Sequence, residues 1–140
     1  MRYVPLIGRA LFAAIFLKAV PGHFQDQTIS FVSEQGIPLA GLFVPLAGLL
    51  ALAGGVSVLL GWRARHGAWL LVAYLVPVTF LMHPFWVVSD PGAAAMQEAM
   101  FFRNVSMLGG ALLITGFGAG PLSMDARETV APFQEFRKAA

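Results

Sequence analysis

Long apolar stretches separated by short polar links dominate the pattern of this chain. Lys, Arg, Asp and Glu are absent from residues 37–62, 67–89 and 104–124. A fourth stretch, residues 5–21, is apolar apart from two cations. A bilayer core about 30 Å thick needs about 20 mostly apolar residues per helical crossing. The pattern therefore predicts an integral membrane protein.

The expected fold is an all-α membrane protein, a four-transmembrane-helix bundle that forms one domain over residues 1–125. The first apolar stretch is predicted to be a retained helix, because Lys18 interrupts it and no signal-peptide cleavage site follows. The polar segment from Gln25 to Gln35 is expected to lie on the outer membrane surface. The four predicted spans cover about residues 5–22, 37–60, 67–83 and 98–117.

The placement of Lys and Arg predicts the orientation of the bundle. These residues concentrate at both ends of the chain and in the link between the second and third spans. The links at residues 24–36 and 84–97 contain neither, and they carry Asp and Glu instead. Both termini, including a short tail at residues 126–140, are therefore expected in the cytoplasm.

Composition excludes several classes of function. Only 11% of residues are charged and 58% are hydrophobic, whereas soluble domains are about 25% charged. The pI near 9.5 does not indicate a nucleic-acid partner, because no basic cluster lies on a soluble segment of sufficient size. The chain has no cysteine, and its histidines match no metal-binding spacing, so no metal site is expected. Catalytic serine motifs, phosphate loops and paired in-span carboxylates are also missing.

Polar side chains gather at the expected level of the outer leaflet. The candidate ligand-binding residues are Lys18, His23, His83, Trp86, Arg103 and Asn104. Hydrogen-bond donors at this depth suit the carbonyl oxygens of a quinone, and histidine carries protons near neutral pH. A lipid headgroup is the alternative ligand. Interfacial side chains that only meet water and headgroups explain the same pattern.

The in-span cations each need an explanation, because a charge at the bilayer centre costs at least about 2.5–3.5 kcal/mol. Helical side chains lean toward the N-terminus of their helix. Arg9 is therefore expected to extend to the inner headgroups. Lys18 leans toward the membrane centre instead, where a freed backbone carbonyl or a ligand oxygen is its expected partner.

Several short motifs resemble the DoxX family of small four-span bacterial membrane proteins. They are Gly8-Arg9 with residues 15–17, residues 54–65, Asn104 with residues 109–113, and residues 118–125. The resemblance implies a four-helix bundle in the bacterial cytoplasmic (inner) membrane. For some relatives it also implies a role as a small subunit of a quinone-dependent oxidoreductase.

Three functions remain open at this point. The leading hypothesis is a membrane subunit of a quinone-linked redox system, with a partner redox subunit and a quinone or headgroup pocket at the outer leaflet. The alternative is a structural anchor or assembly protein, homo-oligomeric or bound to other chains through its glycine-rich helix faces. An anion carrier is ranked lowest.

Overall fold

A computed structural model describes residues 1–127 of the chain, and every regular element in this range is helical. Four helical segments, at Val4–Phe24, Ala40–Leu60, Ala64–Val87 and Pro91–Phe117, are long and apolar enough to cross a membrane. The prediction of an all-α, four-helix membrane protein is therefore confirmed. The elements in chain order are α1 (Val4–Ala19), η1 (Val20–Phe24), α2 (Asp26–Glu34), α3 (Ala40–Leu60), α4 (Ala64–Met82), η2 (Phe85–Val87) and α5 (Pro91–Phe117).

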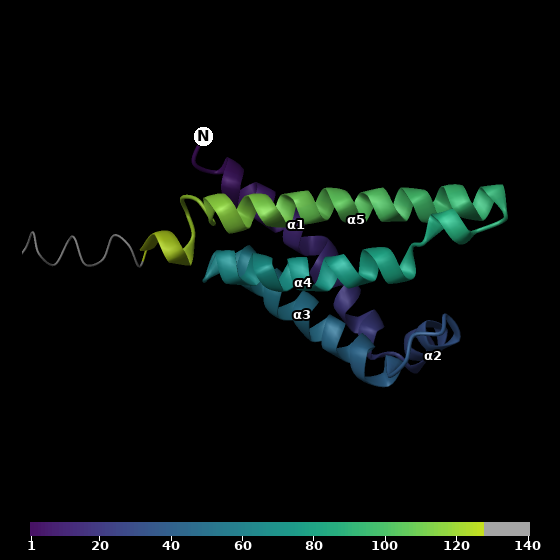
Figure 1. Cartoon of the computed structure of the whole chain (residues 1–140). Helices are drawn as coiled ribbons and strands as arrows, with labels where there is room; N and C mark the ends of the chain where they lie inside the picture. Colours follow the sequence, from purple (N-terminus) through teal and green to yellow (C-terminus); the bar gives the residue numbers. More distant parts are fainter. Residues whose placement is uncertain (128–140) are drawn as a thin grey trace, which may run out of the picture.

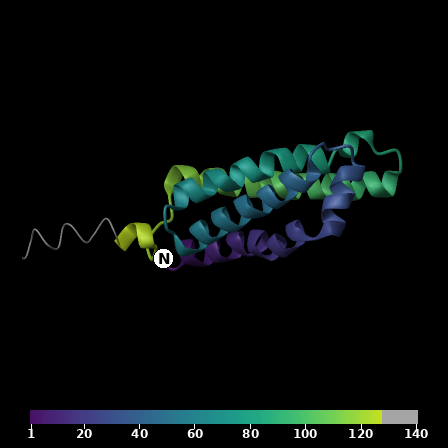
Figure 2. The same ribbon diagram turned by 90° about the horizontal axis from the view of Figure 1, so that it is seen from below.

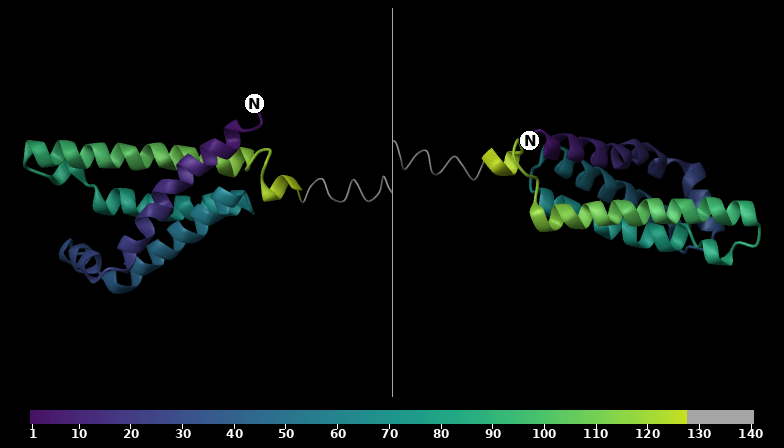
Figure 3. Two further views of the ribbon diagram at one scale, coloured as in Figure 1. Left: turned by 180° about the vertical axis from the view of Figure 1, so that it is seen from behind. Right: turned by 90° about the horizontal axis from the view of Figure 1, so that it is seen from above.

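The four long helices form two antiparallel pairs. Helices α4 and α5 lie side by side, while α1 crosses them obliquely and runs alongside α3 (Figure 1). Seen from below, all four follow roughly one axis (Figure 2). From behind, the α1–α3 pair and the α4–α5 pair diverge toward the end that carries α2 (Figure 3). We call this end the α2 end.

The opposite end of the bundle holds the N-terminus, the link between α3 and α4, and the segment after α5 (Figure 1). Arg2, Arg63 and Arg127 lie in these segments and Arg65 lies in the first turn of α4, so we call it the basic end. Both ends of the described chain lie at this end of the bundle, which agrees with the even number of spans. The cytoplasmic placement of this end stays a prediction, and most of the expected tail, residues 128–140, lies outside the described residues.

Helix α5 begins at Pro91, about two turns before the expected start near residue 98. The Asp90 carboxylate accepts a hydrogen bond of 2.7 Å from the backbone N–H of Ala93, which caps the helix. Pro91 occupies the first helical position, where its missing N–H costs nothing. Hydropathy alone overlooks this first part of α5, because its residues are small rather than strongly apolar.

The segment expected on the outer surface is the short helix α2. It turns one apolar face onto α3, where Val32 is buried against Ala40 and Val44. Phe31 stays half-exposed on the other side of the helix. The α2 end is therefore covered by a helix that packs on the bundle, and the location of this helix on the outer membrane surface stays a prediction.

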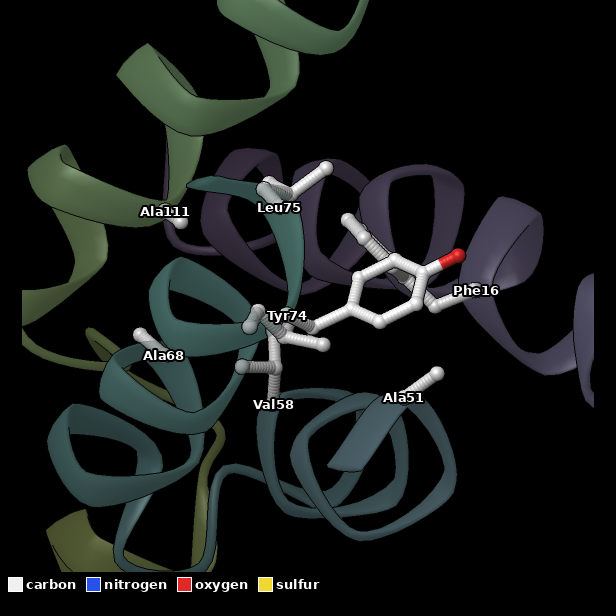
Figure 4. Packing of buried hydrophobic residues seen from close by; sticks show 8 residues of the cluster. Phe16, Ala51, Val58, Ala68, Tyr74, Leu75 and Ala111 are labelled. Carbon is white, nitrogen blue, oxygen red and sulfur yellow. The ribbon is translucent and has the colours of Figure 1, made fainter. Parts of the chain in front are cut away.

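The main core lies where α3, α4 and α5 meet α1. Phe16, Val58, Leu75 and Tyr74 pack together with three buried alanines (Figure 4). Close helix approach depends on glycine at the α3–α4 contact: a Cβ on Gly54 would lie 2.8 Å from the carbonyl oxygen of Gly67 and 2.7 Å from the side chain of Leu71. Small residues are what allow such contacts between helices in lipid.

Gly54→Ala is expected to lower the free energy of unfolding by about 1–3 kcal/mol, because the added methyl group must push α3 and α4 apart. Gly41→Ala on the same helix is the matched control, since a Cβ there meets nothing within 4 Å. The control should leave stability unchanged or raise it by up to about 1 kcal/mol, because alanine is more stable than glycine in a helix. Detergent-denaturation curves followed by circular dichroism measure both. Equal effects of the two substitutions would contradict the close packing of α3 on α4.

Candidate functional site

At the basic end, a carboxylate from the C-terminal segment caps α4. Asp125 accepts hydrogen bonds from the backbone N–H groups of Arg63, at 2.6 Å, and Ala64, at 3.0 Å. Arg63 precedes α4 with a left-handed φ of 46° and offers no side-chain cap of its own. The backbone N–H of Asp125 also donates to the carbonyl of Gly61 at 2.9 Å. Asp125 therefore joins the segment after α5 to the α3–α4 link.

Arg9 lies beside this cap and is only 4% exposed. Its Nη2 donates to the carbonyl oxygen of Leu122 at 2.9 Å, and its guanidinium lies against the Cα of Gly61. Nε and Nη1 are buried without a hydrogen-bond partner among the described residues. The Asp125 carboxylate attracts the guanidinium electrostatically. Arg9 thus ties α1 to the segment after α5.

The expectation that Arg9 extends to the headgroups is wrong. The side chain is enclosed by protein, because the segment after α5 folds back over it. Ser123 holds this fold: its hydroxyl donates to the carbonyl of Gly120 at 2.7 Å and accepts from the backbone N–H of Ala126 at 3.1 Å. We call Arg9, Gly61, Leu122, Ser123 and Asp125 the basic-end lock.

A pocket of about 460 Å³ opens next to the basic-end lock. The start of α4 supplies Arg63, Arg65 and His66 to its wall. The opposite wall is the segment from Gly118 to Ala126, in which Gly118 and Gly120 have left-handed φ angles of 79° and 71°. Three basic side chains therefore surround a cavity at the end of the membrane-spanning region.

The predicted site residues at the α2 end form two groups. His23 donates from Nδ1 to the carbonyl of Ala19 at 2.9 Å, so its Nε2 accepts from the Tyr74 hydroxyl at 3.3 Å. Arg103 interacts electrostatically with Tyr74. The hydrogen bonds of this first group join η1 to α4.

The second group lies on the α4–α5 branch of the bundle. His83 donates from Nδ1 to Oε1 of Gln97 at 2.7 Å. Trp86 is exposed and stacks edge-on with Phe85 and Phe101, with ring centroids 5.2 and 5.8 Å away. His23 belongs to η1 and Trp86 to η2. Figures 1 and 3 show that η1 follows α1 in the α1–α3 pair, whereas η2 lies between α4 and α5 in the other pair.

Of the remaining predicted residues, Asn104 is buried in α5, while Lys18 and Arg103 are exposed. Within residues 1–127, the side chains of Lys18 and Arg103 make no hydrogen bond or ion pair. Residues 1–127 also contain no group of three or more His, Cys, Asp or Glu side chains placed to hold a metal ion.

Sequence reasoning overlooked Asp125. A signal was present: the predicted spans contain one acid, Glu98, and it lies at the far end of the fourth span from Arg9, so Arg9 has to find its counter-charge at the other span ends. Asp125 is the acid that follows the fourth span on the same side of the membrane as the start of the first. A comparison of the expected depths of charged residues on different spans would have paired Asp125 with Arg9.

These features define a small multi-pass membrane protein with four spanning helices, closed at the basic end by polar contacts between distant segments. The chain belongs to the SURF4 family, whose family model matches residues 39–130. Comparison with solved structures finds no significant match.

Bacterial and eukaryotic proteins are among its relatives. The inner membrane protein YqjF of Escherichia coli (strain K12) is 29% identical over 122 residues, covering 86% of this chain and 88% of YqjF. The inner membrane protein YphA of the same organism is 26% identical over 102 residues, covering 73% of this chain and 72% of YphA. The ER-derived vesicles protein ERV29 of Saccharomyces cerevisiae is 25% identical over 81 residues, which is 58% of this chain but only 26% of ERV29.

The expected membership of the DoxX family is wrong, because the family model that matches is SURF4. The motifs that suggested DoxX are structural: Gly54 and Gly55 let helices approach, and Arg9, Gly61 and Asp125 form the basic-end lock. Any small bundle that packs in this way needs similar residues. The redox role that the resemblance implied therefore loses that support.

Asp125→Ala is expected to lower the free energy of unfolding by about 2–3 kcal/mol, because it removes a helix cap and the counter-charge of a buried guanidinium. Asp90→Ala is the matched control, since Asp90 also caps a helix but pairs with no buried cation. It should cost about 1 kcal/mol. Denaturation of the purified variants in detergent compares them, and a smaller loss for Asp125→Ala than for Asp90→Ala would contradict the assignment.

Proposed function

We propose that this protein is a non-catalytic inner membrane protein that assembles with other membrane chains through the exposed face of α5. The proposed location draws on YqjF and YphA, which are both described as inner membrane proteins. The assembly role corresponds to the structural alternative rather than to the redox hypothesis. One observation carries it: two unpacked glycines on the outer side of α5.

The exposed face of α5 is a stripe of small and aliphatic residues. Val105, Gly109, Leu112 and Gly116 follow three- and four-residue spacing, so they lie on one side of the helix. A Cβ on Gly109 or Gly116 would meet nothing within 4 Å. By contrast, Gly110 on the same helix packs against Phe12 of α1. The stripe therefore offers backbone access that the chain itself does not use.

The free-energy cost of glycine within a helix supports a partner for this stripe. Glycine within a helix is less stable than alanine by roughly 0.5–1 kcal/mol. Apolar side chains gain no hydrophobic free energy when they exchange contacts with lipid for contacts with another helix. Helices in a membrane therefore associate through close packing at small residues. Helix α5 is also the least buried of the four spanning helices. A second helix seated on the stripe would use both glycines for close contact.

Quinone binding at the α2 end stays a prediction. Its residues His23 and His83 already have partners within the protein, namely Ala19 and Tyr74 for the first and Gln97 for the second. Proton transfer to a quinone would require these hydrogen bonds to open. The assembly role needs no such rearrangement, and for this reason we prefer it.

The combined substitution Gly109→Leu and Gly116→Leu is expected to weaken assembly at least tenfold, equivalent to about 1.4 kcal/mol, because the leucines block helix approach. The control is Gly41→Leu on α3, where a Cβ also meets nothing within 4 Å. Native mass spectra of the proteins, extracted from their own membranes in mild detergent, give the fraction in complexes.

The control should match the unaltered protein in this experiment. Complexes that persist unchanged in the doubly substituted protein would show that α5 is not the contact. A monomer with a bound quinone as the main species of the unaltered protein would instead favour the redox hypothesis.

A further inference from the structure

We propose that the pocket at the basic end binds the phosphate-bearing headgroup of an anionic phospholipid. The inference is independent of assembly through α5, which uses a different surface. It rests on the charge around the pocket, on its wall of left-handed glycines and on its position at the end of the spanning helices.

The pocket carries a surplus of positive charge. Arg63, Arg65 and His66 line it, and Asp125 is the acidic residue in its wall. The Asp125 carboxylate accepts two backbone hydrogen bonds at the start of α4, and the charge of Arg9 opposes its own. Within residues 1–127, the side chains of Arg65 and His66 make no hydrogen bond or ion pair. Their donors are therefore available to an anion.

Arg65 is positioned across the pocket rather than away from it. A Cβ on Gly118 would lie 3.3 Å from Nε of Arg65, so the guanidinium rests against the glycine backbone of the opposite wall. Gly118 and Gly120 both hold left-handed backbone angles, which favour glycine. The missing side chain of Gly118 lets the Arg65 guanidinium lie close to the backbone of that wall, and the missing side chain of Gly120 makes room for Pro5. A planar guanidinium matches the oxygen pairs of a phosphate.

The location favours a lipid over a soluble anion. Trp62 and Trp69, at the end of α3 and in the first turns of α4, are about half-exposed, and tryptophan prefers the membrane–water interface. The pocket volume, about 460 Å³, lies within the usual range for small-molecule sites. Basic pockets between spanning helices on the cytoplasmic side suit acidic lipid headgroups. The predicted orientation places the basic end there.

The test measures lipid retention by native mass spectrometry of the full chain titrated with phosphatidylglycerol or phosphatidylcholine. One phosphatidylglycerol should be retained preferentially. Each arginine near a lipid surface contributes about fivefold, so Arg63→Gln with Arg65→Gln should reduce the preference about 25-fold. Arg63→Lys with Arg65→Lys should keep most of it. Arg2→Gln, a basic residue of the same end outside the pocket wall, should leave it unchanged.

Three results would overturn the proposal. Equal retention of phosphatidylcholine would show that the headgroup charge is not recognised. An unchanged preference in the double glutamine variant would place the lipid elsewhere. Inorganic phosphate that displaces the lipid at equal concentration would assign the pocket to a free anion. If the double glutamine variant does not fold, Arg65→Gln alone is measured instead. It should reduce the preference for phosphatidylglycerol about fivefold.

Discussion

The whole basic end depends on one constraint, the burial of a guanidinium in a chain whose spanning helices hold a single acid, Glu98, near the opposite end of α5. Arg9 is 4% exposed, and a buried cation without a counter-charge costs several kcal/mol. The segment after α5 provides what it needs: the carbonyl of Leu122 accepts its hydrogen bond and Asp125 attracts its charge. Because Asp125 also caps α4, a single electrostatic requirement connects α1, the α3–α4 link and the end of α5.

This arrangement gives the two ends of the bundle different characters. Glycine contacts hold α3 against α4, and the basic-end lock closes one end. Toward the α2 end the two helix pairs diverge (Figure 3). The lock also creates the basic pocket, since the segment that covers Arg9 forms its opposite wall. The outer face of α5 takes no part in any of these contacts and remains available for a partner, which is why we place assembly there.

The sequence predicted the helices well because membrane spans are set by length and hydropathy, which are local properties. The start of α5 was predicted too late, since the Asp90 cap acts through hydrogen bonding rather than hydropathy. Lys18 and Arg103 show the limit of depth arguments: the sequence predicts a level in the membrane for each, but not the side of the helix that each side chain faces. Arg9 and Asp125 lie more than a hundred residues apart, so their pairing required the fold.

The central claim is that Arg9 and Asp125 act as one unit. The measurement that tests it most directly is a double-mutant cycle of unfolding free energies for Arg9→Met, Asp125→Asn and their combination, in one detergent. The account predicts an interaction energy of at least about 1 kcal/mol between the two sites, with the double variant more stable than the sum of single losses allows. Losses that add within about 0.3–0.5 kcal/mol would contradict it and leave the basic end held by backbone contacts alone.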